Sequence, residues 1–256
     1  MKFDDLDSRM RVFEEAHDHC VLPGINMVAR LDGRSFTRLT KEVMNYEAPF
    51  DVRFRDAMIE TARHLMDCGF RFAYAYSESD EISLLFHPQE ELFGRKTRKL
   101  NSILAGEASA RFSLAIGKVA VFDCRISQLP ANKDVVDYFR WRSEDAHRNA
   151  LNAHCYWLLR KQGASMRIAT GKLEGMSVGE KNELLFQNGI NFNDLPNWQK
   201  RGIGIRRQEF EKQAVNPKTE TEVTARRRRL EIELELPMKD AYSAYIAEII
   251  EEFTTE

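Results

Sequence analysis

The chain has 256 residues, of which 43% are hydrophobic and 30% charged, and its formal net charge is −2. This length and composition fit one large or two small globular domains and exclude a disordered chain. No apolar stretch approaches a membrane span, and the charged N-terminus lacks the apolar core of a signal peptide. We therefore expect a cytoplasmic protein with no membrane partner, in which local patches make any nucleic-acid contact.

The first half of the chain alternates strand and helix patterns. In chain order we predict a strand over 26–32, a helix over 51–68, strands over 70–77 and 81–86, a helix over 92–116 and a strand over 118–126. This order is the split βαββαβ motif of ferredoxin-like folds. We expect an α+β fold whose antiparallel sheet has the first and third strands as central neighbours.

The second half has a different pattern. We predict a long helix over 132–162, a helix through 181–187 opened by the capping box of Ser177 and Glu180, strands over 203–213 and 221–236 joined by the turn NPKTE, and a last helix over 238–253. No repeat or low-complexity linker separates the halves. We therefore expect the helical segment, the β-hairpin and the last helix to pack on the first half.

The predicted topology brings two acidic segments together. Asp32 ends the first strand, and Asp80 and Glu81 open the third strand beside it. Two carboxylates from adjacent strands can hold two Mg²⁺ ions about 3.5–4 Å apart. Gly33 has no Cβ, so the backbone there can approach a phosphate closely. Each segment alone would be an ordinary acidic turn, and their predicted convergence favours a metal site.

Cationic side chains form three further groups. The segment GRKTRK (94–99) lies near a predicted helix start and is either a triphosphate contact or a solvated face. The helix over 132–162 mixes aromatic and basic residues, a mixture that suits RNA, although about half of these aromatics should lie in the core. The run Arg226 to Arg229 either contacts RNA backbone, pairs with nearby glutamates or stays solvated, and we slightly favour the last two.

Four segments resemble the tRNA-histidine guanylyltransferase superfamily of 3′→5′ polymerases. They are RLDGRSFTR (30–38), YSESDEISLLF (76–86), DYFRWRSEDAHRNAL (137–151) and KNELLF with GINFN (181–193). The resemblance covers roughly residues 1–205 in order, so an accidental match of single motifs is excluded. It implies a polymerase-type palm, the catalytic domain, over 1–130, and an RNA-binding helical and β-hairpin region over 131–256.

The resemblance also implies residue roles. Asp32, the Gly33 carbonyl and Asp80 would bind two Mg²⁺ ions, with Glu81 beside them as a further catalytic carboxylate. The residues implied at the nucleotide are Arg30, Arg34, Ser35, Phe36, Ser79, Lys96 and Lys99. The residues implied at the RNA are Arg140, His147, Asn152, Lys181 and Arg201.

The implied reaction adds nucleotides to the 5′ end of tRNA, with ATP, GTP and other nucleoside triphosphates as substrates. Eukaryotic histidine-specific members carry His-Ile-Asn-Asn where this chain has His147, Arg148, Asn149 and Ala150. The chain therefore resembles more the bacterial and archaeal branch, which extends 5′-truncated tRNAs by template pairing. Family members commonly form tetramers, so the resemblance also implies a homotetramer. The alternatives are a histidine-tRNA-specific guanylyltransferase, a nucleotide cyclase with a similar palm, and a non-catalytic RNA-binding protein.

Overall fold

The computed structural model describes residues 2–215 and 222–254. The predicted turn NPKTE (216–220) lies outside these residues. The elements in chain order are α1 (Phe3–Glu15), β1 (Asn26–Gly33), α2 (Phe36–Arg38), η1 (Leu39–Val43), α3 (Val52–Met66), β2 (Phe72–Glu78), β3 (Glu81–Phe86), η2 (Leu92–Arg95), α4 (Thr97–Ile116), β4 (Phe122–Leu129), α5 (Asn132–Lys161), α6 (Met166–Leu173), α7 (Val178–Phe186), η3 (Phe192–Asp194), α8 (Asn197–Arg201), β5 (Ile203–Val215), β6 (Glu222–Glu233) and α9 (Lys239–Thr254).

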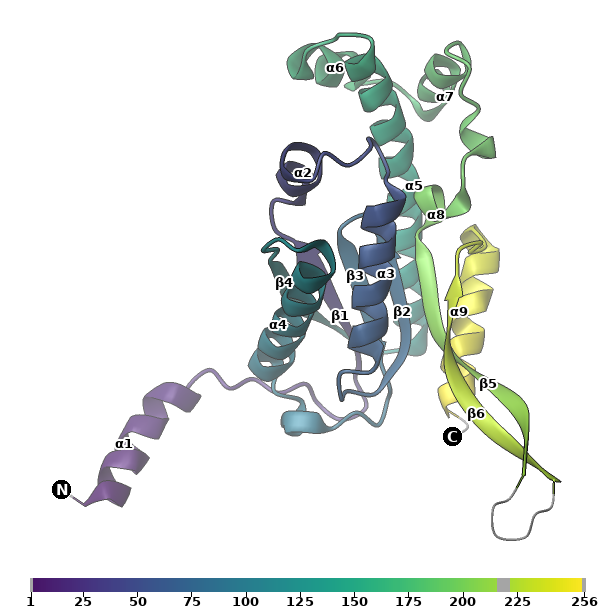
Figure 1. The fold of residues 1–256 in the computed structure, drawn as a ribbon. Coiled ribbons are helices and arrows are strands. Elements are labelled where there is room, and N and C mark those ends of the chain that lie inside the picture. The colour runs from purple at the N-terminus through teal and green to yellow at the C-terminus, as the bar shows by residue number, and fades with distance from the viewer. Residues whose placement is uncertain (1, 216–221, 255–256) are drawn as a thin grey trace.

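One six-stranded antiparallel sheet organises the molecule (Figure 1). Its order is β4-β1-β3-β2-β5-β6, so the predicted ferredoxin-like arrangement of the first four strands is confirmed, with β1 and β3 as neighbours. The predicted C-terminal hairpin is present as β5 and β6. It does not merely pack on the palm, because β5 pairs with β2 and extends the same sheet.

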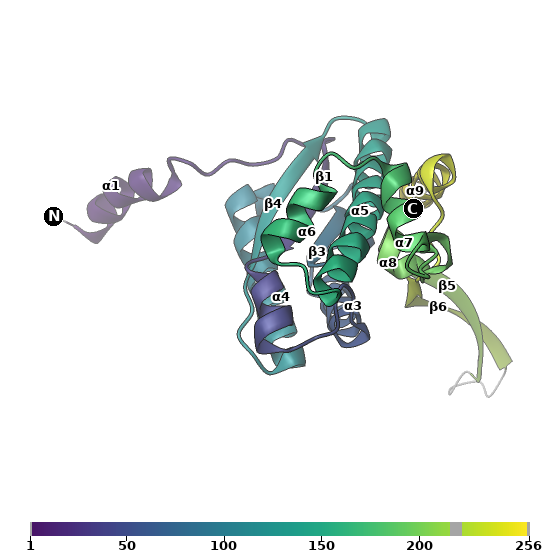
Figure 2. The same cartoon turned by 90° about the horizontal axis from the view of Figure 1, so that it is seen from above.

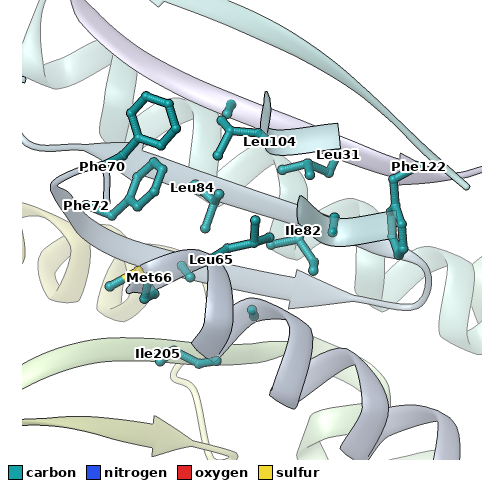
Figure 3. Packing of buried hydrophobic residues seen from close by; sticks show 14 of the residues in the cluster. Leu31, Leu65, Met66, Phe70, Phe72, Ile82, Leu84, Leu104, Phe122 and Ile205 are labelled. Atoms are coloured by element: carbon teal, nitrogen blue, oxygen red, sulfur yellow. The ribbon is translucent and has the colours of Figure 1, made fainter. Parts of the chain in front are cut away.

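Helices cover both faces of this sheet. In Figure 1, α3 and α4 lie in front of it, while α5 and α9 lie behind. Successive side chains of a strand point to opposite faces of the sheet. Leu31 therefore packs in the core under α3 and α4, whereas Val28 packs in the core under α5 and α9. Figure 3 shows the first of these cores, where Leu31, Ile82 and Leu84 meet side chains of α3 and α4.

A helical lobe extends beyond the end of the sheet (Figures 1 and 2). The second half of α5, a helix of 30 residues, packs there with α6 and α7 around its own buried cluster. The predicted capping box is confirmed: the Glu180 amide donates to the Ser177 hydroxyl, and the Ser177 amide donates to the Glu180 carboxylate at 2.7 Å. This cap fixes the start of α7, which carries Lys181.

Several predicted boundaries differ from the structure. The helix expected from residue 92 begins at Thr97, because Phe93 and Gly94 have φ angles of 56° and 59°, outside the helical region. The strand expected from residue 118 begins at Phe122, the partner of Gly33. The helices α1, α6 and α8 were not predicted, and α6 and α8 have only eight and five residues. Within the described residues, no helix combines the length and apolar character needed to cross a bilayer.

Candidate active site

The two predicted acids meet at one end of the sheet. The Gly33 amide donates to the Asp80 carbonyl at 3.0 Å, and Asp32 lies opposite Glu81 across the β1–β3 pair. Asp32 and Asp80 both line a cavity of about 440 Å³. Burial, and then the negative charge of Asp32, raises the pKa of the Asp80 carboxyl. A bound cation would relieve the repulsion between these two carboxylates.

Local backbone geometry explains how the acids reach this position. Ser79 and Asp80 form a two-residue connection between β2 and β3, and Ser79 has the positive φ (46°) that such hairpin turns need. After β1 the chain turns sharply. A Cβ built on Gly33 would lie 2.6 Å from the ring of Phe36, so only glycine fits there. Phe36 itself is buried against Phe112 and Phe122.

The donor set fits a hard divalent cation. Carboxylate and backbone oxygens are the ligands that Mg²⁺ prefers, with substrate phosphates and water completing its octahedral shell. Among the described residues, no group of three or more His, Cys, Asp or Glu side chains is arranged to hold a metal. The protein would therefore hold such an ion through the two aspartates, and a phosphate substrate would supply the remaining ligands.

A buried ion network lies behind the acidic turn. Arg142 of α5, only 6% exposed, donates Nε to Glu81 at 2.7 Å and Nη2 to Glu78 at 2.7 Å. Its Nη2 also donates to the second Glu81 oxygen at 2.9 Å, and its Nη1 donates to Asp145 at 3.2 Å. Burial raises the pKa of Glu78 to about 8 and also raises the pKa of Glu81. Arg142 therefore fixes the residues on both sides of the turn that carries Asp80.

Aromatic side chains also line the cavity. Tyr46, Phe50, Trp157 and Trp198 belong to its wall. Lys41 lies 5.7 Å from the Trp157 ring centre and donates Nζ to the carbonyl oxygens of Glu47 and Pro49 at 2.7 and 3.3 Å. Flat apolar walls beside carboxylates suit a molecule with a stacking ring at one end and phosphates at the other. The cavity has this composition.

Comparison with known proteins identifies the family. The model of the tRNAHis guanylyltransferase family matches residues 7–130, and the model of its C-terminal domain matches residues 133–250. The chain belongs to the tRNAHis guanylyltransferase family. Members of this family are nucleotidyltransferases that act in tRNA processing, and the chain is therefore a nucleotidyltransferase. The resemblance noted in the sequence is thus confirmed.

Three relatives describe the similarity. A probable tRNA(His) guanylyltransferase from Drosophila melanogaster is 30% identical over 231 residues, covering 84% of this chain and 80% of that protein. A bacterial tRNA(His) guanylyltransferase-like protein in complex with ATP aligns with a TM-score of 0.75 and 27% identity, covering 96% of this chain and 97% of that one. A similar bacterial complex with GTP aligns with a TM-score of 0.72 and 26% identity, covering 98% and 100%.

Five of the residues that were predicted to contact the nucleotide in this nucleotidyltransferase lie around Asp32 and Asp80. Ser79 and Phe36 line the cavity. Arg34 and Ser35 are exposed in the turn after β1, where the Arg34 amide donates to the Val121 carbonyl at 2.8 Å. Arg30 lies on β1 with its guanidinium 3.8 Å from Glu81 and 5.8 Å from the Trp141 ring centre. Arg30 is therefore next to the acids but outside the cavity wall.

Lys96 and Lys99 do not join the site in this chain. The strand β3 starts beside Asp32 and runs away from it, so the helix α4 that follows begins at the far end of the sheet. That end is roughly 25 Å away, from the length of an eight-residue strand. Lys96 pairs there with Asp18 at 2.6 Å. The expectation that this pair lies near the triphosphate is not met within one chain.

The residues predicted at the RNA are dispersed along the second half. Arg140 pairs with Glu144 and Asp240, and Arg201 donates to the Leu236 carbonyl at 2.9 Å. Asn152 is exposed on α5, and Lys181 is half-buried on α7. His147 packs against Phe192 at 5.3 Å between ring centres, outside the cavity wall. Burial, and then the charges of Lys200, Arg201 and Lys239, lowers the pKa of His147.

Sequence reasoning missed residues that the fold brings to the cavity. Lys41 and Trp198 line it, and so does Asn149, which had been named from the sequence only within the stretch 147–150 and which donates to Asp145 at 3.1 Å. None of these belongs to a spacing pattern that indicates a ligand. From the sequence, Arg142 was included only as one residue of an aromatic and basic helix. Its spacing of three residues from Asp145 is typical of an ion pair on one helix face, and the two side chains do form such a pair. That spacing was the available signal.

Proposed function

We propose that this chain adds nucleotides to the 5′ end of tRNA in the 3′→5′ direction and selects each one by pairing with the opposite strand. Its substrates would be tRNAs with truncated 5′ ends. The observation that supports this best is the pair Asp32 and Asp80, from separate segments, facing one cavity with aromatic walls. A polymerase-like reaction needs this combination, because it places a nucleoside triphosphate against two metal-binding carboxylates.

The cavity supports a division of roles. Asp32, the Gly33 carbonyl and Asp80 would hold two Mg²⁺ ions, which when bound lower the pKa of an attacking hydroxyl and neutralise triphosphate charge. The rings of Trp157 and Trp198 would receive the base, and Ser79 at the turn would contact phosphate. Glu81 would act through Arg142, because both of its oxygens accept hydrogen bonds from that side chain.

The proposed reaction has two steps. An oxygen of the RNA 5′-monophosphate attacks the α-phosphorus of ATP, the bond to the β-phosphate breaks and pyrophosphate leaves. The 3′-hydroxyl of an incoming nucleotide then attacks the activated 5′ phosphorus, loses its proton and releases AMP. An RNA that already carries a 5′-triphosphate needs only the second step, with pyrophosphate as the leaving group. The bacterial structures with ATP and with GTP support nucleotides of both kinds as substrates.

Two observations bear on the choice of RNA. The near-complete mutual coverage with the bacterial guanylyltransferase-like protein supports the repair of truncated tRNAs. The replacement of the eukaryotic His-Ile-Asn-Asn stretch by residues 147–150 of this chain supports it too. The second candidate is the addition of one guanylate to histidine tRNA, which is favoured by the names of the curated eukaryotic relatives at 30–33% identity.

One incorporation experiment separates these candidates. The protein is incubated with Mg²⁺, ATP, each labelled nucleoside triphosphate and a tRNA that lacks its first nucleotide. We expect incorporation of the nucleotide complementary to the opposing base, and no incorporation by Asp32→Ala. Addition of guanylate whatever the opposing base would support the histidine-tRNA candidate. No incorporation into any RNA, or a cyclic product from GTP alone, would contradict a 5′-end polymerase.

We further propose that the chain assembles as a homotetramer. The helix α1 has no buried residue and projects from the body in both ribbon views (Figures 1 and 2). Its apolar residues Phe3, Leu6, Met10 and Phe13 follow helical spacing and are 38–78% exposed. An exposed apolar stripe of this kind supports a contact between chains. Light scattering should give four times the chain mass, and Met10→Asp with Phe13→Asp should lower it; a wild-type monomer would contradict the assembly.

A further inference from the structure

The face of the sheet that carries Asp32 is only partly covered near its β4 edge. On the pair β1–β4, the partners Val28 and Ser127, Arg30 and Arg125, and Asp32 and Asp123 all point to the α5 side. The helix α5 covers Val28, but Arg125 and Asp123 are exposed. Trp141 of α5, which is 53% exposed, borders this open strip beside Arg30.

Two arginines lie directly opposite each other in this strip. Arg30 and Arg125 are Cα partners across the antiparallel pair, so their side chains leave the sheet side by side. Like charges in this arrangement destabilise a sheet unless another group compensates them. An anion held between the two guanidinium groups would provide that compensation and would be contacted from two sides.

The protein itself leaves both guanidinium groups incompletely satisfied. The Arg30 Nε is buried without a hydrogen-bond partner, and its nearest carboxylate oxygen, on Glu81, is 3.8 Å away. Glu81 is already bonded twice to Arg142. Arg125 contacts Asp123 at 3.3 Å, but these side chains are 54% and 64% exposed. An exposed pair of this kind contributes little and is readily exchanged for a phosphate.

Trp141 adds an aromatic surface to the two cations. The guanidinium groups of Arg30 and Arg142 lie 5.8 and 4.7 Å from its ring centre, so the indole is held in place although it is half exposed. A tryptophan fixed in this way stacks well with a nucleobase, because little conformational entropy is lost on binding. The strip therefore offers a site for a base next to a site for a phosphate.

The strip and the cavity both include Asp32 but otherwise have different linings. Asp32 belongs to the cavity wall, whereas Arg30, Arg125 and Trp141 do not. Arg30 precedes Asp32 by two residues on the same strand face, a separation of roughly 6.6 Å. Joining two substrates at one pair of carboxylates requires a place for each of them. The cavity with its aromatic walls suits the free nucleoside triphosphate, and the exposed strip suits the end of a large molecule.

We propose that Arg30, Arg125 and Trp141 receive the 5′-terminal nucleotide of the RNA, with the two arginines on its phosphate and the indole against its base. This inference rests on the proposed function and adds to it the position of the RNA end and two residues, Arg125 and Trp141. It predicts that these two side chains affect RNA affinity without affecting the affinity of the protein for a nucleoside triphosphate.

The test for Arg125 compares two forms of one truncated tRNA, with a 5′-monophosphate or a 5′-hydroxyl. We expect the wild-type protein to bind the phosphorylated form about tenfold more tightly, and Arg125→Ala to lose most of this preference. The salt dependence of RNA binding should weaken by about one counterion. Arg63→Ala, which removes an exposed arginine on α3 under the opposite face, is the matched control and should keep the preference.

The test for Trp141 uses a pair of variants. Trp141→Leu should raise the Kd for the tRNA about tenfold, whereas Trp141→Phe, which keeps a ring, should recover most of the affinity. The Kd for ATP and GTP should stay within about twofold of wild type in all variants. An unchanged phosphate preference in Arg125→Ala, or equal RNA affinity of the Leu and Phe variants, would overturn the proposal. If the wild-type protein adds no nucleotide to any RNA, the proposed function itself fails.

Discussion

Replacement of Asp80 by asparagine is expected to reduce nucleotide addition roughly 1000-fold, a barrier increase of ~4 kcal/mol. The asparagine amide is nearly the same size as the Asp80 carboxylate but carries no charge. The variant therefore has only one anionic ligand for Mg²⁺, Asp32, in place of two. The rate should be measured as incorporation of labelled nucleotide into a truncated tRNA at saturating substrate. The loss should appear in kcat, because the cavity walls that hold the nucleotide stay intact.

The same variant should not lose stability. Burial and the charge of Asp32 raise the pKa of Asp80, so its ionised form is unfavourable in the metal-free fold. When the pKa of a carboxyl is higher in the folded than in the unfolded state, the free energy of unfolding decreases as the pH rises through the folded-state pKa. An asparagine at this position stays neutral, so the variant does not show this decrease. Thermal unfolding without metal at pH 8 should therefore give an equal or higher Tm for Asp80→Asn. Added Mg²⁺ should raise the Tm of the wild-type protein but not of the variant.

The control for this prediction is Asp137→Asn. Asp137 is an exposed carboxylate on α5 that pairs with Lys133 one helical turn away. Its replacement should change neither the incorporation rate nor the response of the Tm to Mg²⁺. Full activity in Asp80→Asn would show that this carboxylate is not part of the reacting centre.

Removal of Arg142 should have the largest effect on stability. At pH 9, above the pKa of about 8 of Glu78, Arg142→Ala leaves Glu78 and Glu81 buried without their cation, and breaking a buried ion pair in this way costs about 3–5 kcal/mol. For a chain of this size the Tm should fall by roughly 10 °C. Arg142→Lys should recover only part of the loss, because an ammonium group cannot reproduce the planar fork that bonds several carboxylates. Denaturant unfolding followed by circular dichroism measures the change.

Two further variants test the physical cause. Adding Glu78→Gln to Arg142→Ala should restore part of the stability, because the amide leaves no uncompensated charge in the core. Arg148→Ala is the matched control: Arg148 contacts Asp145 of the same network at 2.6 Å but is 75% exposed. It should change stability by no more than about 0.5 kcal/mol. A loss below about 1 kcal/mol in Arg142→Ala would mean that the two glutamates are neutral in the fold.

Much of the palm could be predicted because its information is local. The alternating aromatic residues of the strand predicted over 70–77 and the Ser177 capping box each act through neighbours a few residues away in the chain. The convergence of Asp32 and Asp80 was also accessible, since the order of strands and helices admits few topologies. The start of α4 was misplaced, because positive φ angles at Phe93 and Gly94 leave no strong mark in the sequence.

The sequence by itself determined the strands of the sheet, the longer helices and the two aspartates at its end, because each follows from short-range pattern or from strand order, and its motifs indicated the family by resemblance. Only the tertiary structure decided that Lys96 lies at the far end of that sheet, that β5 and β6 extend it, and that Arg142 joins Glu78 to Glu81. Those features depend on the direction in which a strand runs and on contacts between residues more than sixty positions apart, and a pattern along the chain does not encode either.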